Sequence, residues 1–158
     1  MNNDLLLKIA EEYGTPTFVF DTDDFAKQAD LIKTALGDIP LCYSIKANPF
    51  LLHALPKSVS YVEVCSPGEL AICRRLNVDP EKIIYSGVNK GFADVGDAVD
   101  YGAAILTAES ERHIEIINEV CRGKGKRAYV ILRITSGNQF GMDFDKVCEI
   151  ISMREKYE

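Results

Sequence analysis

The chain has 158 residues and a mass of 17.6 kDa, which is the size of one domain with a core of its own. Its composition, 47% hydrophobic and 27% charged, is that of a globular protein and argues against disorder. A complete (β/α)8 barrel takes about 200–250 residues, so the length excludes a whole barrel of that kind.

The excess of acidic residues limits the classes of partner that the chain is expected to bind. With 24 acidic and 18 basic residues the net charge is −6, which disfavours nucleic acid or an anionic membrane as the main partner. No apolar run reaches the roughly 20 residues of a membrane span, and the first residues lack a signal-peptide pattern. The five cysteines form no C-x-x-C pair, so we expect neither a disulfide framework nor a zinc site, and most of them should be small buried residues. We expect a cytoplasmic protein.

Strand and helix patterns alternate along the chain. A helix is predicted over 5–13, a short strand over 17–20, and a helix capped by Thr22 or Asp23 that ends near residue 36. A strand followed by a helix then occurs five times. The strands are predicted over 41–45, 61–65, 83–86, 103–107 and 129–134, the last being the longest. A short helix is predicted after Pro49, and longer ones over 67–76, 92–101, 111–121 and 144–156.

The strands are continuously apolar, which is typical of a parallel sheet that is buried on both faces. Two α/β architectures fit this pattern. One is an incomplete (β/α)8 barrel of the TIM type, with about five βα units present. The other is a five-stranded doubly wound open sheet, which 158 residues would complete. Periodicity alone does not choose between them.

Lys46 is the main candidate for chemistry, because it follows an apolar strand at the edge where parallel α/β folds build their sites. Partial desolvation would lower the pKa of its amine and free it as a nucleophile toward an aldehyde. The alternative is a lysine that merely extends into solvent at a strand end.

Two charges interrupt apolar strands. Glu63 and Arg133 would be costly inside a buried sheet unless they pair with each other or hold a polar ligand, although either could instead lie at a strand end in water. The polar loop over 85–91, which includes Lys90, could line a pocket or be an ordinary turn. His53 and His113 are expected on helices away from this edge.

The segment Ser66-Pro67-Gly68-Glu69 has the residues of a capping box, so the start of a helix explains Glu69 without a catalytic role.

Five motifs occur in order along the chain. They are GTPTFVFD at 14–21, CYSIKAN at 42–48, EVCSPGEL at 63–70, IYSGVNK at 84–90, and LRI at 132–134 with FGM at 140–142. This series resembles the N-terminal part of the fold-type III decarboxylases that depend on pyridoxal phosphate, which act on diaminopimelate, ornithine or arginine and have an alanine-racemase-like barrel. The resemblance favours the barrel over the open sheet.

The resemblance implies a role for each candidate residue. Lys46 matches the lysine that binds pyridoxal phosphate covalently, Glu63 an acidic residue close to the cofactor, and Arg133 an arginine near the cofactor's 3′-oxygen. Glu69 and Lys90 match recurrent residues to which we assign no role. The segment over 17–20 would be the strand that leads in from a β-sandwich domain.

The implied function is decarboxylation of a small amino acid, with diaminopimelate as the favoured substrate and lysine biosynthesis as the context. Residues 1–158 would be the first part of the barrel domain, as a fragment or a split-gene product that is not competent alone. The family's phosphate loop, its partner for the ring nitrogen and its β-sandwich have no counterpart among these residues. The complete enzymes of the family are homodimers. The alternative is a non-catalytic relative that binds pyridoxal phosphate or another protein.

Overall fold

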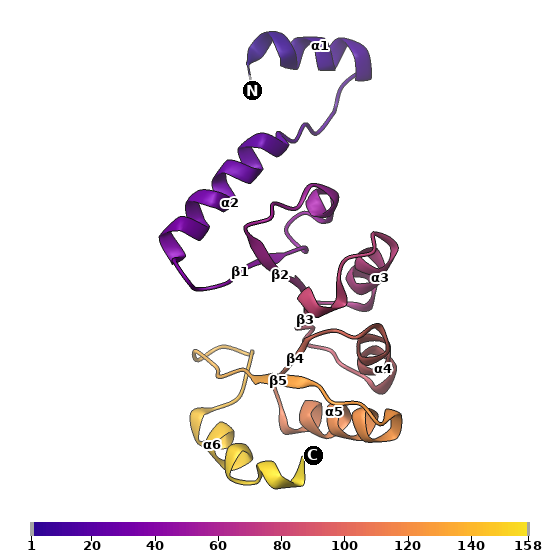
Figure 1. The fold of residues 1–158 in the computed structure, drawn as a ribbon, viewed down its shortest axis with the longest axis vertical. Coiled ribbons are helices and arrows are strands. Elements are labelled where there is room, and N and C mark those ends of the chain that lie inside the picture. Colours follow the sequence, from indigo (N-terminus) through magenta and orange to yellow (C-terminus); the bar gives the residue numbers. More distant parts are fainter. Residues whose placement is uncertain (1, 158) are drawn as a thin grey trace.

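Five parallel strands form one sheet in which each strand lies beside the next strand along the chain (Figure 1). The computed structural model describes residues 2–157. The strands are β1 (Leu41–Ser44), β2 (Val59–Val64), β3 (Ile83–Tyr85), β4 (Ile105–Ala108) and β5 (Tyr129–Leu132). A doubly wound sheet changes direction at a switch point, and this order contains none. The strands therefore form part of a (β/α)8 barrel, and the open-sheet alternative is excluded.

Three helices cover one face of the sheet. They are α3 (Pro67–Arg75), α4 (Phe92–Tyr101) and α5 (Glu111–Lys124), which follow β2, β3 and β4 and stack along the same side (Figure 1). Alternate strand residues point toward these helices, and burial of each large apolar side chain contributes about 1.5–3 kcal/mol. The largest fully buried side chains are Tyr85, Ile45, Ile83, Leu106, Val62, Val64, Val95 and Cys73.

The remaining helices lie outside this layer, and the first helix of the chain lies away from the sheet with no buried residue (Figure 1). They are α1 (Asn3–Tyr13), α2 (Thr22–Leu36), α6 (Phe144–Ser152) and the short 3₁₀ helices Pro49–Ala54, Pro80–Lys82 and Arg154–Lys156. Asp21 caps α2, because its Oδ1 accepts hydrogen bonds from the amides of Asp23 and Asp24 at 3.1 Å, so the prediction of Thr22 or Asp23 as the cap is wrong. The helix predicted to end at residue 121 continues to Lys124.

One predicted strand does not form, and another is shorter than predicted. The segment over 17–20 is not a strand; it lies away from the sheet, and Phe18 is 92% exposed. A strand needs hydrogen bonds from a neighbour to form. The strand predicted over 129–134 forms over Tyr129–Leu132 as β5, because its neighbour β4 ends at Ala108, which pairs with Leu132. Tyr129 is 82% exposed, since β5 pairs with β4 on one edge alone among the described strands.

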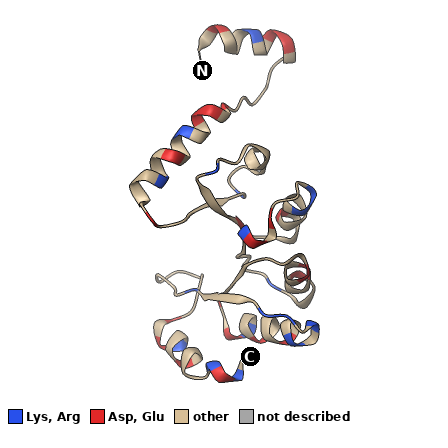
Figure 2. Cartoon of the chain, in the orientation of Figure 1, with Lys and Arg blue, Asp and Glu red and all other residues tan. Residues whose placement is uncertain are grey.

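Charged residues lie on the helices and loops, whereas the strands are almost free of them (Figure 2). Within the five described strands Glu63 is the only charged residue. None of the described helices has the length and apolar character that crossing a membrane requires.

The five cysteines are all free, and only Cys73 and Cys121 are buried, so the prediction that most are buried is wrong. Cys42 and Cys148 are exposed, and Cys65 is half-buried near the strand ends.

Candidate active site

The sheet presents one row of side chains after another on the face opposite α3, α4 and α5. Strand register places Glu63 beside Ile84, Ile84 beside Ile105, and Ile105 beside Tyr129. Side chains two residues further along a strand point to the same face. The next row, at the carboxyl ends of the strands, therefore contains Cys65, Ser86, Thr107 and Ile131.

This row forms the floor of a cavity of about 490 Å³. Ligand pockets in proteins are typically about 300–1,000 Å³. The cavity is lined by Lys46, Glu63, Cys65, Ser86, Val88, Thr107, Ile131, Arg133 and Phe140. The structure thus brings the three predicted site residues together, although they come from positions far apart in the chain.

Lys46 lies in the turn that follows β1 and is exposed, so the expected desolvation of its side chain is wrong. The reason is that β1 pairs only with β2 among the described strands, and the lysine lies past its end. The segment after the lysine is held in place. The Tyr43 hydroxyl donates to the Asn48 carbonyl at 2.8 Å, and the Asn48 side chain accepts from the Phe50 amide at 3.0 Å.

Glu63 projects from β2 into the cavity and is held by a serine. The Ser86 hydroxyl donates to Glu63 Oε1 at 2.5 Å, and Cys65 Sγ lies 3.4 Å from the same hydroxyl. Burial favours a raised pKa for Glu63, but the nearby hydroxyls of Ser44 and Ser86 and the positive charges of Lys46 and Arg133 outweigh it and lower the pKa. Glu63 is therefore a carboxylate at neutral pH.

Arg133 comes one residue after β5 and is held on two sides. Its guanidinium donates to Glu109 Oε1 at 3.1 Å and lies over the Phe140 ring, 5.0 Å from the centroid. The Glu109 side chain is 6% exposed, whereas that of Arg133 is 45% exposed toward the cavity. The prediction that Glu63 and Arg133 pair with each other is not confirmed, since each has a partner of its own.

Glu69 has a structural role at the start of α3. Ser66 Oγ accepts from the Glu69 amide at 3.2 Å, which is one half of the predicted capping box. The Glu69 carboxylate accepts from the amide of Cys65 at 2.8 Å, not from that of Ser66. It therefore fixes the backbone where β2 ends, directly below the cavity.

Several site residues had no role predicted from the sequence. Glu109 follows the last residue of β4, so its place at the end of a parallel strand was the signal that could have found it. Phe140 belongs to the FGM motif at 140–142, but no role at the site was predicted for it. His113 was expected away from this edge, but its Nδ1 accepts a hydrogen bond from the Glu109 amide at 3.3 Å, because the first turn of α5 starts at the same edge. Burial lowers the pKa of His113.

The lowered pKa of Glu63 predicts a pH dependence of stability. A carboxyl whose pKa is lower in the folded chain contributes stability above its ordinary value of 4.5, and this is lost as pH falls through the folded value. Urea unfolding should therefore give a constant difference between the wild type and Glu63→Gln above that pH and a shrinking one below it. Glu119→Gln, on the exposed side of α5, serves as the control. An unchanged difference down to pH 3 would contradict the expectation.

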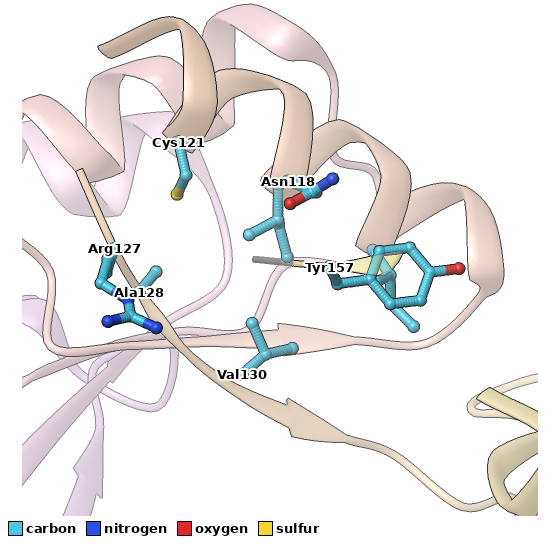
Figure 3. A pocket seen from close by; sticks show the side chains of 8 residues that line it. Asn118, Cys121, Arg127, Ala128, Val130 and Tyr157 are labelled. Carbon is cyan, nitrogen blue, oxygen red and sulfur yellow. The ribbon is translucent and has the colours of Figure 1, made fainter. Parts of the chain in front are cut away.

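A second cavity, of about 190 Å³, lies between α5 and β5 (Figure 3). Arg127 and Tyr157 lie at opposite sides of the view, and Arg127 is its only charged residue. None of the predicted site residues lines this space; they line the cavity at the strand ends.

The arrangement defines a class of protein. An amine, a carboxylate and a guanidinium around one cavity, at the carboxyl ends of parallel barrel strands, are typical of an α/β-barrel enzyme. The family described as "Pyridoxal-dependent decarboxylase, pyridoxal binding domain" matches residues 22–151, and the chain belongs to this family.

Relatives with curated names agree with the family. The chain is 30% identical over 131 residues to the diaminopimelate decarboxylase of Aquifex aeolicus, covering 82% of this chain and 31% of the relative. It is 34% identical over 137 residues to that of Mycobacterium leprae, covering 84% of this chain and 29% of the relative. The chain thus spans about a third of the length of these relatives.

Solved structures share the fold. The crystal structure of AQ1208 from Aquifex aeolicus has a TM-score of 0.83 and 28% identity, covering 97% of this chain and 39% of that one. The lysine/ornithine decarboxylase from Vibrio vulnificus, solved with putrescine, has a TM-score of 0.86 and 20% identity, covering 98% of this chain and 42% of that one. At that identity the second likeness shows the fold alone.

Pyridoxal phosphate is the cofactor of this family, and the side chains at the cavity suit it. The cofactor carries an aldehyde, anionic oxygens and a flat ring. Lys46 supplies an amine, Arg133 a guanidinium for an anionic oxygen, and Val88, Ile131 and Phe140 an apolar wall.

Proposed function

We propose that this chain carries the lysine and part of the cofactor site of a pyridoxal-phosphate-dependent amino-acid decarboxylase, with diaminopimelate as its substrate. The observation that carries the proposal is the convergence of Lys46, Glu63 and Arg133, from three different strand ends, on one cavity. The names of the relatives support diaminopimelate.

Each residue at the cavity has a separate role in the proposed reaction. Bound pyridoxal phosphate supplies an aldehyde and a ring that accepts the electrons released when a carboxylate leaves. Lys46 would hold the cofactor through its amine, which the substrate amine would replace. Glu63, kept charged by Ser86 and the nearby cations, accepts hydrogen bonds and stabilises positive charge beside it. Arg133 would donate to an anionic oxygen of the cofactor, and the apolar wall would contact its flat ring.

Further parts of the proposal concern the whole protein. Residues 1–158 form the first part of a longer barrel domain, which the relatives' length supports, since this chain covers 31% of the Aquifex enzyme. A homodimer and a cytoplasmic location rest on the resemblance to the family and stay predictions.

A labelling experiment tests the assignment of the lysine. The chain is mixed with pyridoxal phosphate, reduced with borohydride and digested, and the modified lysine is identified by mass spectrometry. We expect the label on Lys46 at substoichiometric cofactor. Label spread over the exposed lysines would contradict a cofactor site. Selective label without lysine formed from diaminopimelate would favour a non-catalytic relative or an incomplete enzyme over an active one.

A further inference from the structure

The loop that follows β5 closes on itself at the cavity. Its two ends are joined by backbone hydrogen bonds, in which the Met142 amide donates to the Arg133 carbonyl at 2.8 Å and the Thr135 amide donates to the Met142 carbonyl at 2.9 Å. Met142 is buried in the hydrophobic core, so the returning end of the loop is anchored. The chain therefore leaves the sheet after β5 and returns beside the residue at which the loop began.

The close approach of the two ends depends on Gly141. Its φ of 83° lies in the left-handed region that glycine adopts without strain. A Cβ at this position would lie 2.8 Å from the carbonyl carbon of Ile134 and 2.9 Å from the carbonyl oxygen of Arg133, and neither backbone atom can move aside cheaply. The preceding residue is fixed as well, because the Asn138 side chain accepts a hydrogen bond from the Phe140 amide at 2.9 Å. The backbone of the loop thus determines where Phe140 lies.

The closed loop brings the ring of Phe140 against the guanidinium of Arg133. Arg133 Cζ lies 5.0 Å from the ring centroid, and the same guanidinium donates to Glu109 Oε1 at 3.1 Å. The face of an aromatic ring is negative and attracts a guanidinium placed over it. Arg133 has a long, half-exposed side chain that would otherwise occupy many rotamers. The ring and the carboxylate together restrict it to one arrangement.

We propose that Phe140 is a positioning residue that acts through Arg133, by holding the guanidinium at the cavity together with Glu109. A single hydrogen bond to Glu109 leaves the guanidinium free to rotate about it, and the ring face removes that freedom. Arg133 and Phe140 both line the cavity, so the guanidinium is already oriented when an anionic oxygen arrives, which reduces the entropic cost of binding. The inference deepens the proposed function and rests on it for its consequence, which is binding of pyridoxal phosphate.

Phe140→Leu should weaken the affinity for pyridoxal phosphate about two- to fivefold, which is the range expected for loss of a half-exposed cation–π contact. Leucine keeps an apolar side chain at the cavity wall and removes only the ring face. The same change in an Arg133→Met background should weaken affinity no further, because the residue through which Phe140 acts is already lost. Affinity is measured by titration of the visible absorbance band.

Phe92→Leu is the matched control for this titration. Arg112 Cζ lies 5.5 Å from the centroid of the Phe92 ring, so the contact is of the same kind, but neither residue lines the cavity. This variant should bind the cofactor with wild-type affinity. An equal loss from Phe140→Leu with and without Arg133 would overturn the proposal and show that the ring contacts the cofactor directly. Full affinity in Phe140→Leu would overturn it as well.

A second readout needs no cofactor and separates the two proposals. The heteronuclear ¹⁵N–¹H Overhauser effect of Arg133 Nε reports how mobile the side chain is in the free chain. It should fall in Phe140→Leu and stay unchanged in Phe92→Leu. If the wild type binds no cofactor, the proposed function fails, whereas this measurement still decides the role of Phe140. Equal mobility of Arg133 in the wild type and in Phe140→Leu would refute that role.

The wild-type chain alone provides a further test that does not depend on how a variant folds. Proton Overhauser contacts should join the Arg133 side chain to the ring of Phe140, as the distance of 5.0 Å between Cζ and the centroid requires. Absence of these contacts would overturn the proposal.

Discussion

Replacement of Lys46 by alanine is expected to abolish the visible absorbance band of the chain mixed with pyridoxal phosphate. The band reports the covalent link between the cofactor and a lysine, and Lys46 is the lysine that lines the cavity. The free energy of unfolding should stay within about 0.5 kcal/mol of the wild type, because the side chain is exposed and follows the end of β1. The combination of total spectral loss and intact stability distinguishes loss of a reactive group from loss of the fold.

Lys82→Ala provides the matched control for this experiment. Lys82 is exposed as well, but it precedes β3 and so lies at the opposite end of the sheet. Its replacement removes the same charge and should leave the band unchanged. A band of full intensity in Lys46→Ala would show that another lysine is the reactive one, and would remove the residue on which the proposed function depends.

Gly87→Ala is expected to destabilise the chain by about 2 kcal/mol, the typical cost of forcing an extra methyl into a packed site. A Cβ at this position would lie 2.4 Å from the carbonyl oxygen of Cys65 and 3.1 Å from its carbon. Both atoms belong to the backbone at the end of β2, which is tied to Glu69 by a hydrogen bond of 2.8 Å. The strand ends must therefore move apart, and with them Ser86 and the carboxylate that it holds.

Gly123→Ala tests whether the effect is specific to that contact. Gly123 lies in α5, and a Cβ there has no neighbour within 4 Å. Alanine is a better helix former than glycine by about 1 kcal/mol, so this variant should gain stability. Urea unfolding of both variants measures the two effects with opposite signs. Equal stability of Gly87→Ala and the wild type would show that β2 and the loop after β3 are not packed as described.

Much of the fold followed from local pattern. The helix over 92–101 agrees with the structure at both ends, because Gly102 stops it in a left-handed conformation that glycine adopts without strain. The periodicity of apolar residues could not distinguish a barrel from an open sheet, since both contain the same strands and helices. Pairing order decides between them, and pairing is a property of contacts between distant residues. The five motifs carried that information through resemblance alone.

The sequence predicts which residues line the site, but it does not predict which contacts they make. Lys46, Glu63 and Arg133 line one cavity, as expected of residues at strand ends. The partner of Arg133 is Glu109, which no motif had marked, and the exposure of Lys46 depends on which strands lie beside β1. Their roles toward the cofactor stay predictions. The segment over 17–20 also shows what the sequence does not reveal: its residues have a high strand propensity, but no neighbouring strand is there to pair with them.

The order of the strands also has a consequence for how the chain folds as it is made. Each strand pairs with the strand that was synthesised just before it. A new strand can therefore join the sheet as soon as it is made, and the helix that follows then covers it. Each connection closes a loop of one βα unit, which costs less chain entropy than pairing strands from opposite ends of the chain. A nascent chain can thus extend the sheet unit by unit on the ribosome, and the cavity acquires Lys46 first, Glu63 second and Arg133 last.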